Sequence, residues 1–255
     1  MDLELQDRAF LITGGTDGLG FALAQRLVAE GALVAVCGRD EERLARAQEL
    51  LGRDALCSKT DVTNADQLDD FVSAALTRFG RLDGAVNNAG RSAGTPVATS
   101  DDDEWRSDYE LKVIAALHVA RQVLSALETT HGAIVNVLAI LARTPNANTT
   151  PTSASRLAGL ALTKALANEV GSRGIRVNAI LIGLIESGQW VRRAADANVS
   201  IDEFYATLAA NAKIPLGRVG RAEEFADLAA FLLSPRSSYV TGVGVSIDGG
   251  MSPVI

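Results

Sequence analysis

A glycine-rich turn directly after the first strand-like segment constrains the fold more than any other feature of this sequence. Residues 13 to 20 read Thr-Gly-Gly-Thr-Asp-Gly-Leu-Gly, and apolar residues at helical spacing over 19–27 predict a helix that begins near Gly18. A glycine turn between strand and helix lets backbone N–H groups and the positive helix end approach a pyrophosphate closely. We therefore expect a bound dinucleotide. The residues expected to contact it here are Gly14, Thr16, Asp17, Gly18, Leu19 and Gly20.

Short β-branched runs alternate with longer helical patterns along the chain. The predicted strands are residues 9–13, 33–37, 55–58, 84–87, 133–137, 176–180 and 243–247. They are apolar almost throughout, which is typical of a parallel sheet covered on both faces, and right-handed crossovers make such a sheet doubly wound. The sequence predicts an α/β Rossmann fold with one seven-stranded parallel sheet, in a single domain over residues 1–255.

One segment interrupts this alternation. Residues 187–214 form a mostly helical stretch that carries several aromatic and basic side chains. Open α/β sheets bind ligands beyond the carboxyl ends of their strands. We predict that 187–214 is a small helical lid over the substrate, with Trp190 and Tyr205 in contact with it.

The composition argues against several kinds of partner. A net charge of −7, with 24 basic residues scattered along the chain, disfavours nucleic acid. No apolar run suits a membrane span and the amino terminus lacks a signal-peptide pattern, so we expect a cytoplasmic protein with no membrane partner. The cysteines and histidines have no metal-ligand spacing, so no metal is expected. They are Cys37, Cys57, His118 and His131.

Three more motifs follow the glycine turn in order: Asp61-Val62, Asn87-Asn88-Ala89-Gly90 and Ile247-Asp248-Gly249-Gly250. Together with the T-G-x-x-x-G-x-G turn they resemble the short-chain dehydrogenase/reductase family over almost the whole chain. The resemblance implies a nicotinamide dinucleotide cofactor. It assigns Asp61 and Val62 to the adenine. It assigns Asn88, Ala89 and Gly90 to the ribose side. It assigns Ile185 and Ser187 to the nicotinamide carboxamide.

The end of the second strand bears on the choice of cofactor. An acid there would bind the ribose 2′-hydroxyl of NAD, whereas a base suits the 2′-phosphate of NADP. The sequence has Gly38-Arg39 at this point, and an arginine can bind a phosphate with two hydrogen bonds. Arg39 therefore favours NADP(H). Asp17 in the glycine turn and the adjacent Asp40 keep NAD(H) possible.

The family resemblance also locates four catalytic positions, and all four differ from the usual asparagine, serine, tyrosine and lysine. They hold Lys112, Ala139, Thr152 and Arg156. Threonine is too weak an acid to replace a tuned phenol, and arginine effectively never gives up its proton. The usual proton relay therefore cannot operate. We expect Ala139 to adjoin the substrate.

The replacements suggest a different chemistry at the same place. Lys112 and Arg156 would set two cations where a negative oxygen forms, and a desolvated lysine beside an arginine can also become an acid. We take Lys112, Arg156 and Thr152 as the candidate catalytic residues. Two other readings stay open: Arg156 could hold the nicotinamide ribose, and Lys112 could extend into solvent.

This pattern, with Pro145-Asn146-Ala147-Asn148 ahead of Thr152, resembles one divergent branch of the family, which contains a reductase of the bacilysin pathway. The resemblance implies hydride addition to a conjugated C=C bond, where an enolate needs stabilisation but can take its proton later from water. Reduction of a ketone is the closest alternative. A non-redox isomerase, cyclase or lyase that keeps its dinucleotide, and a catalytically silent relative, also remain open.

Two expectations concern partners. The cations at the site favour a small anionic substrate, and they include Arg192 and Arg193 of the lid. The resemblance implies a homotetramer or homodimer formed through the long central helices and the carboxyl-terminal segment. The candidate interface residues are Ala115, Leu117 and Val119, or Leu160, Leu162 and Leu166.

Overall fold

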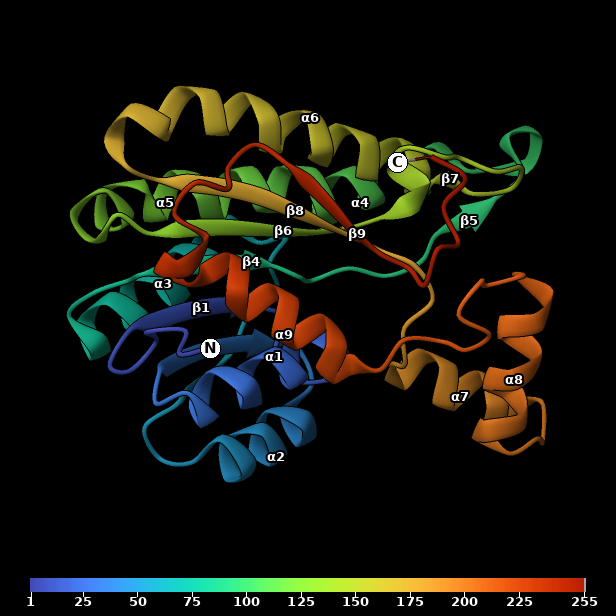
Figure 1. Ribbon diagram of the computed structural model, residues 1–255, viewed down its shortest axis with the longest axis horizontal. Helices are drawn as coiled ribbons and strands as arrows, with labels where there is room; N and C mark the ends of the chain where they lie inside the picture. The colour runs from blue at the N-terminus through green and yellow to red at the C-terminus, as the bar shows by residue number, and fades with distance from the viewer. Residues whose placement is uncertain (255) are drawn as a thin grey trace.

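The computed structural model describes residues 1–254, and within them a parallel sheet forms the centre of the molecule (Figure 1). Its seven strands have the order β3-β2-β1-β4-β6-β8-β9. They are β1 (Ala9–Thr13), β2 (Leu33–Gly38), β3 (Leu56–Lys59), β4 (Gly84–Asn87), β6 (Ala133–Ala139), β8 (Arg176–Ile182) and β9 (Gly244–Ile247). The order reverses between β1 and β4, which creates the switch point where such sheets bind ligands. The predicted doubly wound fold is confirmed.

Three strands are longer than the sequence predicts, and β2 gains only Gly38. β6 and β8 each continue for two more residues, because Leu138 pairs with Leu181 and Ala139 with Ile182 in the parallel register. The short antiparallel pair β5 (Gly94–Thr95) and β7 (Thr150–Pro151) was not predicted. Strands of two residues carry no apolar period, so only the fold brings them together.

Helices cover both faces of the sheet (Figure 1). One face packs against α1 (Gly18–Ala29), α2 (Glu41–Leu51) and α9 (Ala222–Leu233). The other packs against α3 (Ala65–Phe79), α5 (Ala115–Thr130) and α6 (Thr152–Val170). Alternation along β1 serves both layers, since Phe10 and Ile12 enter the first core and Leu11 the second. Burying each of these side chains stabilises the fold by roughly 1.5–3 kcal/mol.

The segment predicted as a lid is helical, with α7 (Gly188–Asp196) and α8 (Ile201–Asn211) standing apart from the sheet at the right of Figure 1. The indole N–H of Trp190 donates to the Ile185 carbonyl over 3.0 Å. The Arg193 guanidinium lies 4.9 Å from the centre of the Trp190 ring, and the Phe204 ring lies 6.2 Å from it. Trp190 therefore joins the two lid helices and ties them to the chain leaving β8.

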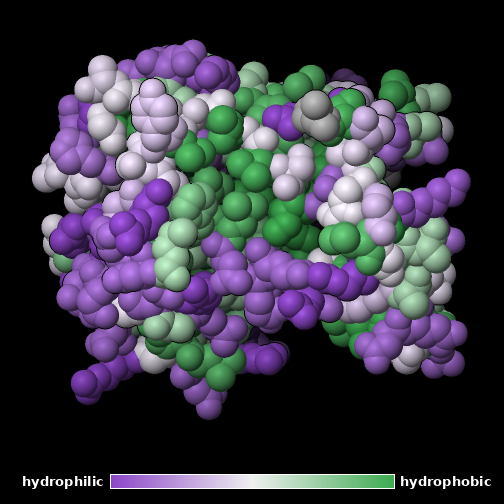
Figure 2. All heavy atoms as spheres, viewed as in Figure 1, coloured by the Kyte–Doolittle hydropathy of each residue, from purple (hydrophilic) through white to green (hydrophobic). Residues whose placement is uncertain are grey.

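Three of the six candidate interface residues are part of the core. Ala115, Val119 and Leu166 are buried within the single chain, so the expectation that they lie at an interface is wrong. Two apolar side chains in this region are exposed. Ile114 lies on the turn that leads into α5, and Leu157 lies on α6. Figure 2 shows hydrophobic residues gathered in the centre of one face, which is the face nearest to β9 in the same view in Figure 1. Self-association stays a prediction.

None of the helices within residues 1–254 is both long enough and apolar enough to cross a membrane.

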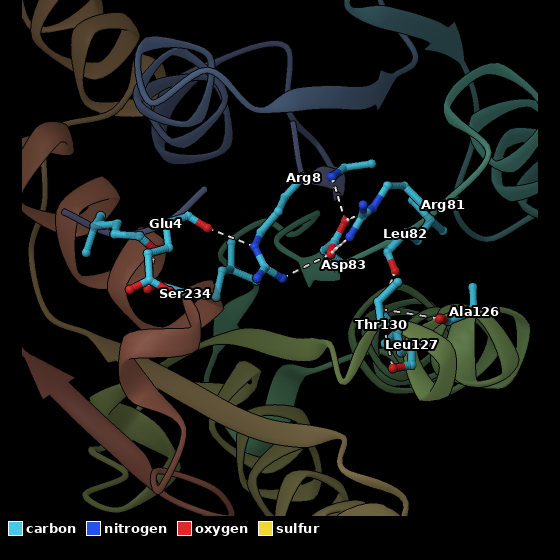
Figure 3. Close-up of polar contacts among 12 residues, drawn as sticks. Glu4, Arg8, Arg81, Leu82, Asp83, Ala126, Leu127, Thr130 and Ser234 are labelled. Carbon is cyan, nitrogen blue, oxygen red and sulfur yellow. Dashed lines mark hydrogen bonds and ion pairs between the residues drawn. The ribbon is translucent and has the colours of Figure 1, made fainter. Parts of the chain in front are cut away.

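A buried carboxylate fastens the amino ends of two strands (Figure 3). Asp83 precedes β4, is 1% exposed, and accepts the backbone N–H of Ala9 over 2.9 Å. It also accepts from Arg8 over 3.1 Å and from both Arg81 nitrogens over 2.7 and 2.8 Å. The arrangement fixes the start of β1 against the start of β4, at the edge of the sheet opposite the glycine turn.

We expect Asp83→Asn to lower the free energy of unfolding by about 2 kcal/mol, because the amide loses charge-assisted hydrogen bonds from both arginines. Urea unfolding followed by circular dichroism measures this. Asp103→Asn, at an exposed carboxylate on the first turn of α4 (Asp102–Tyr109), is the control and should leave stability nearly unchanged. Equal effects of the two substitutions would contradict the prediction.

Candidate active site

The glycine turn has the close approach that the sequence predicts. Gly14 and Gly18 adopt φ angles of +64° and +55°, which side chains rarely tolerate. A Cβ atom at Gly20 would lie 2.4 Å from Asn88 Nδ2 and 2.5 Å from the Gly14 carbonyl oxygen. No side chain fits there, so the first turn of α1 packs directly on Asn88 and on the backbone that leaves β1.

The end of β4 is fastened to this turn. Asn88 Nδ2 donates to the carbonyls of Thr13 and Gly14 over 3.0 and 2.9 Å. In return, the Thr13 hydroxyl accepts the backbone N–H groups of Asn88 and Ala89 over 3.0 and 3.1 Å. The sequence analysis placed Thr13 in a strand. In the structure it joins the glycine turn to Asn88 and Ala89 across the switch point.

The adenosine end of the predicted site carries an exposed cation. Arg39 follows β2, is 77% exposed, and lies 3.5 Å from the Asp61 carboxylate. Burial raises the pKa of Asp61, but hydrogen bonds from Thr63 and the Arg39 charge outweigh it, so the pKa is lowered. Arg39 and Asp61 therefore lie together as charged neighbours at the end of the second strand.

Asp17 lies where the turn meets the lid. One carboxylate oxygen accepts the N–H of Gly18 over 2.8 Å. The other lies 3.0 Å from a guanidinium nitrogen of Arg43 on α2 and 3.9 Å from one of Arg192 on α7. The sequence analysis did not predict that arginines from two elements would lie near this acid.

The predicted nicotinamide end contains two buried polar atoms without partners among residues 1–254: the Ser187 hydroxyl oxygen and Arg156 Nε. The space around them adjoins the other cofactor segments. A Cβ atom on Gly18 would lie 3.8 Å from the Ser187 Cβ, and one on Gly90 would lie 3.0 Å from an Arg156 nitrogen. A ribose hydroxyl and a carboxamide would satisfy such atoms, so these residues fit a nicotinamide dinucleotide.

The predicted catalytic residues Lys112 and Thr152 are in contact. Lys112 lies in a π-helical turn, Glu110–Ile114, between α4 and α5. Its ammonium donates to the Thr152 hydroxyl over 2.9 Å. The Lys112 side chain is 0% exposed, so the alternative that it extends into solvent is wrong. Turns of this kind are often found at functional sites.

Asp108 is a site residue that the sequence interpretation missed. Its Oδ1 lies 2.5 Å from the Lys112 Nζ and makes no other polar contact, and its side chain is 0% exposed. Its Oδ2 accepts the Ser155 hydroxyl over 2.6 Å. The i,i+4 spacing of Asp108 and Lys112 was a usable signal, but on an unplaced helix it indicates only a surface pair.

Thr152 ties these groups to the loop after β4. Its hydroxyl accepts the backbone N–H of Ala93 over 2.9 Å in addition to Lys112, and its own N–H donates to the Ala93 carbonyl over 3.4 Å. The strand pair β5–β7 continues this contact. Thr152 therefore acts as a hydrogen-bond acceptor that holds Lys112 in place.

The environment lowers the pKa of Lys112 to about 8. Burial is the largest cause, the Arg156 charge and the more distant Arg91 act in the same direction, and Asp108 opposes them. Burial also lowers the pKa of Arg156 to about 10, so it remains a cation at neutral pH. The two cations expected from the sequence are close enough to interact, but a carboxylate that was not expected offsets one of them.

The remaining predicted residues surround this cluster. Ala139 ends β6, and Arg156 donates to the carbonyl of Val137 on the same strand. Burial and the nearby Glu186 raise the pKa of Tyr205 of α8, while the backbone of Ser187 lies close enough to lower that pKa slightly. Tyr205 thus lies beside a predicted nicotinamide contact, and contact of the lid with a substrate stays a prediction.

Comparison with known proteins identifies the class to which this fold and site belong. A family profile described as enoyl-(acyl carrier protein) reductase matches residues 14–252. The 3-oxoacyl-[acyl-carrier-protein] reductase of Chlamydia muridarum is 32% identical over 257 residues, covering 99% of this chain and 100% of that protein. The chain belongs to the short-chain dehydrogenase/reductase family of oxidoreductases.

Two solved structures are similar over nearly the whole chain. A short-chain oxidoreductase of Pseudomonas aeruginosa PAO1 with an atypical catalytic center, in its NADPH-bound structure, has a TM-score of 0.92 and 38% identity, covering 97% of this chain and 98% of that one. L-sorbose reductase of Gluconobacter frateurii, complexed with NADPH and L-sorbose, has a TM-score of 0.94 and 29% identity, with 100% of each chain covered.

Gly20→Ala should destabilise the protein by roughly 1–3 kcal/mol, because the added methyl group collides with Asn88 and the Gly14 backbone. It should also weaken dinucleotide binding measured by NADPH fluorescence. Gly171→Ala is the matched control: its φ is −58° and a Cβ atom there meets nothing within 4 Å. That variant should be as stable as the wild type or slightly more stable. Unchanged NADPH affinity in Gly20→Ala would contradict the assignment of this turn.

Proposed function

We propose that the chain is an NADP(H)-dependent reductase of a small anionic enone or ketone, in which Lys112 stabilises and protonates the oxygen that becomes negative. One observation carries the proposal: a buried lysine ammonium bonded to Thr152, the residue aligned with the family's catalytic tyrosine. The site therefore has an acidic group where the usual acid is missing.

NADP(H) as the cofactor has two supports. Arg39 is exposed at the end of β2, where a 2′-phosphate would lie, and its neighbour Asp61 lies at 3.5 Å. The similar Pseudomonas oxidoreductase and the sorbose reductase both have NADPH-bound structures. Bound NADPH would supply a hydride. Gly14, Gly18, Ser187 and Arg156 would orient it against the substrate.

The residues of this chain suit conjugate reduction. When hydride adds to an enone, negative charge collects on the enolate oxygen, and fixed cations stabilise that charge. Lys112 and Arg156 provide them, and Lys112 can also donate a proton below its pKa of about 8. A ketone would use the same groups with the charge on an alkoxide.

An anionic substrate fits the charges around the opening of the site. Arg91 follows the Asn87–Gly90 motif, is exposed, and donates to the Ser107 hydroxyl over 3.2 Å, with no carboxylate within 4 Å among the described residues. Arg193 lies over Trp190 on the proposed lid. These guanidinium groups would attract a carboxylate on the substrate and could bind it with charge-assisted hydrogen bonds.

The test is incubation with NADPH and a panel of conjugated keto acids and simple keto acids, followed by absorbance at the nicotinamide band and by product mass. A gain of two hydrogens is expected for at least one substrate. Lys112→Met should lower kcat by about 100-fold or more while NADPH still binds. Lys164→Met, at an exposed lysine on α6, is the control.

Two other outcomes would assign a different function. A product of unchanged mass with unchanged cofactor would indicate an isomerase, a cyclase or a lyase that retains its dinucleotide. Failure to bind NADPH or NADH at millimolar concentration would indicate a catalytically silent relative.

Arg39→Ala should weaken NADPH binding by about 10-fold or more and leave NADH binding nearly unchanged, because only the 2′-phosphate loses a charged partner. Titration of cofactor fluorescence measures both dissociation constants. Arg46→Ala, at an exposed arginine on the neighbouring α2, controls for net charge. If the substitution weakens the binding of NADPH and NADH equally, or weakens neither, Arg39 does not select NADP(H).

A further inference from the structure

Asp108 and Lys112 form a buried ion pair, and burial of two charged side chains is unfavourable in free energy. Both side chains are 0% exposed, and the two charged atoms lie 2.5 Å apart. Removing two ions from water costs several kcal/mol per ion, and a hydrophobic pair of similar volume is often as stable. Buried ion pairs are therefore weak evidence for a role in stability alone.

We infer that Asp108 is a positioning residue for catalysis, which fixes Lys112 as a cation directed at Thr152 and the substrate oxygen beside it. The inference rests on the proposed function. It adds a residue on which the chemistry of Lys112 depends, although Asp108 itself need not touch the substrate.

The geometry fixes the carboxylate from both sides. The Ser155 hydroxyl on α6 holds Oδ2 over 2.6 Å, and this leaves Oδ1 facing Lys112. Ser155 also donates to the Thr152 carbonyl over 3.0 Å. Asp108 is thus anchored to the same helix turn that carries Thr152, so Lys112 and its second partner are held by one rigid unit.

The charges that act on Lys112 come from three elements: Asp108 on α4, Arg156 on α6 and Arg91 in the loop after β4. Burial and the two arginines favour the neutral amine, and Asp108 favours the ammonium. Without this carboxylate nothing in that set would oppose deprotonation. Lys112 would then lose its proton at lower pH, and the fraction of protein able to stabilise an oxyanion and donate a proton near pH 7 would fall.

The proton step is balanced within the site. An N–H bond of the Lys112 ammonium breaks and an O–H bond forms on the alkoxide or enolate, so the oxygen becomes neutral and Lys112 becomes an amine. Asp108 then loses its nearest counterion, which is costly for a buried carboxylate. Uptake of a proton from solvent by Lys112 removes that cost. Asp108 therefore also favours recharging of the acid after each turnover.

The experiment is an NMR titration of the substrate-free protein with lysine labelled at the ε-carbon. The chain has four lysines, Lys59, Lys112, Lys164 and Lys213, so Lys112→Met assigns the signal. In the wild type Lys112 should titrate near pH 8. In Asp108→Asn its midpoint should fall by about one pH unit or more, whereas Asp108→Glu, which keeps the charge, should stay closer to the wild type.

Asp83→Asn is the matched control, since it also removes a buried, paired carboxylate but lies at the opposite edge of the sheet. It should not move the Lys112 midpoint. If Asp108→Asn leaves that midpoint unchanged, the inference is overturned. Should Asp108→Asn fail to fold, Ser155→Ala decides in its place, because it frees the Asp108 oxygen that Ser155 holds and should still shift the Lys112 midpoint. An unchanged midpoint in that variant overturns the inference.

Activity separates this inference from the proposed function. The kcat of the wild type should fall as pH rises through about 8, because Lys112 must be protonated. In Asp108→Asn this fall should move to lower pH by the same amount as the NMR midpoint. A shifted NMR midpoint in a protein that reduces no substrate would refute the proposed function but not the Asp108–Lys112 coupling.

Discussion

The contact between the glycine turn and Asn88 at the switch point of the sheet is the constraint on which the site depends. It exists because Gly20 has no side chain, which lets Asn88 bond to the carbonyls of Thr13 and Gly14. The contact brings the carboxyl ends of β1 and β4 together. The loop that leaves β4 then runs to Ala93, which is bonded to Thr152. One backbone approach thereby connects the proposed cofactor site to the proposed catalytic group.

The chemistry of Lys112 follows from burial acting on an ordinary side chain. Free lysine and tyrosine have similar acidities, with pKa values of about 10.4 and about 10. A lysine can therefore take over the proton donation of a phenol if its surroundings lower its pKa comparably. Here burial and Arg156 lower it, while Asp108 limits the fall to about 8. The charge also changes, because lysine starts as a cation and can stabilise an oxyanion before any proton moves.

The sequence predicted the fold far better than the details of the site. Apolar strands and the glycine turn are dense local signals, and all seven sheet strands were found within two residues of their ends. The contact of Lys112 with Thr152, 40 positions apart, followed only from the family resemblance. Asp108 and Ser155 were missed, because their significance lies in burial and in a turn between two helices, and neither leaves a periodic pattern. Val119, which the family resemblance offered as an interface residue, is fully buried in the core.

Asp17 lies between the predicted lid and the proposed cofactor site. Asp17 alone would repel the phosphates of a dinucleotide, but Arg43 of α2 and Arg192 of the lid lie on its carboxylate. All three side chains are well exposed, so each pair contributes roughly 1 kcal/mol or less to stability. Their effect is to offset the negative charge of Asp17. Asp17 therefore does not argue against NADP(H), since its charge is balanced locally while Arg39 remains open to a phosphate.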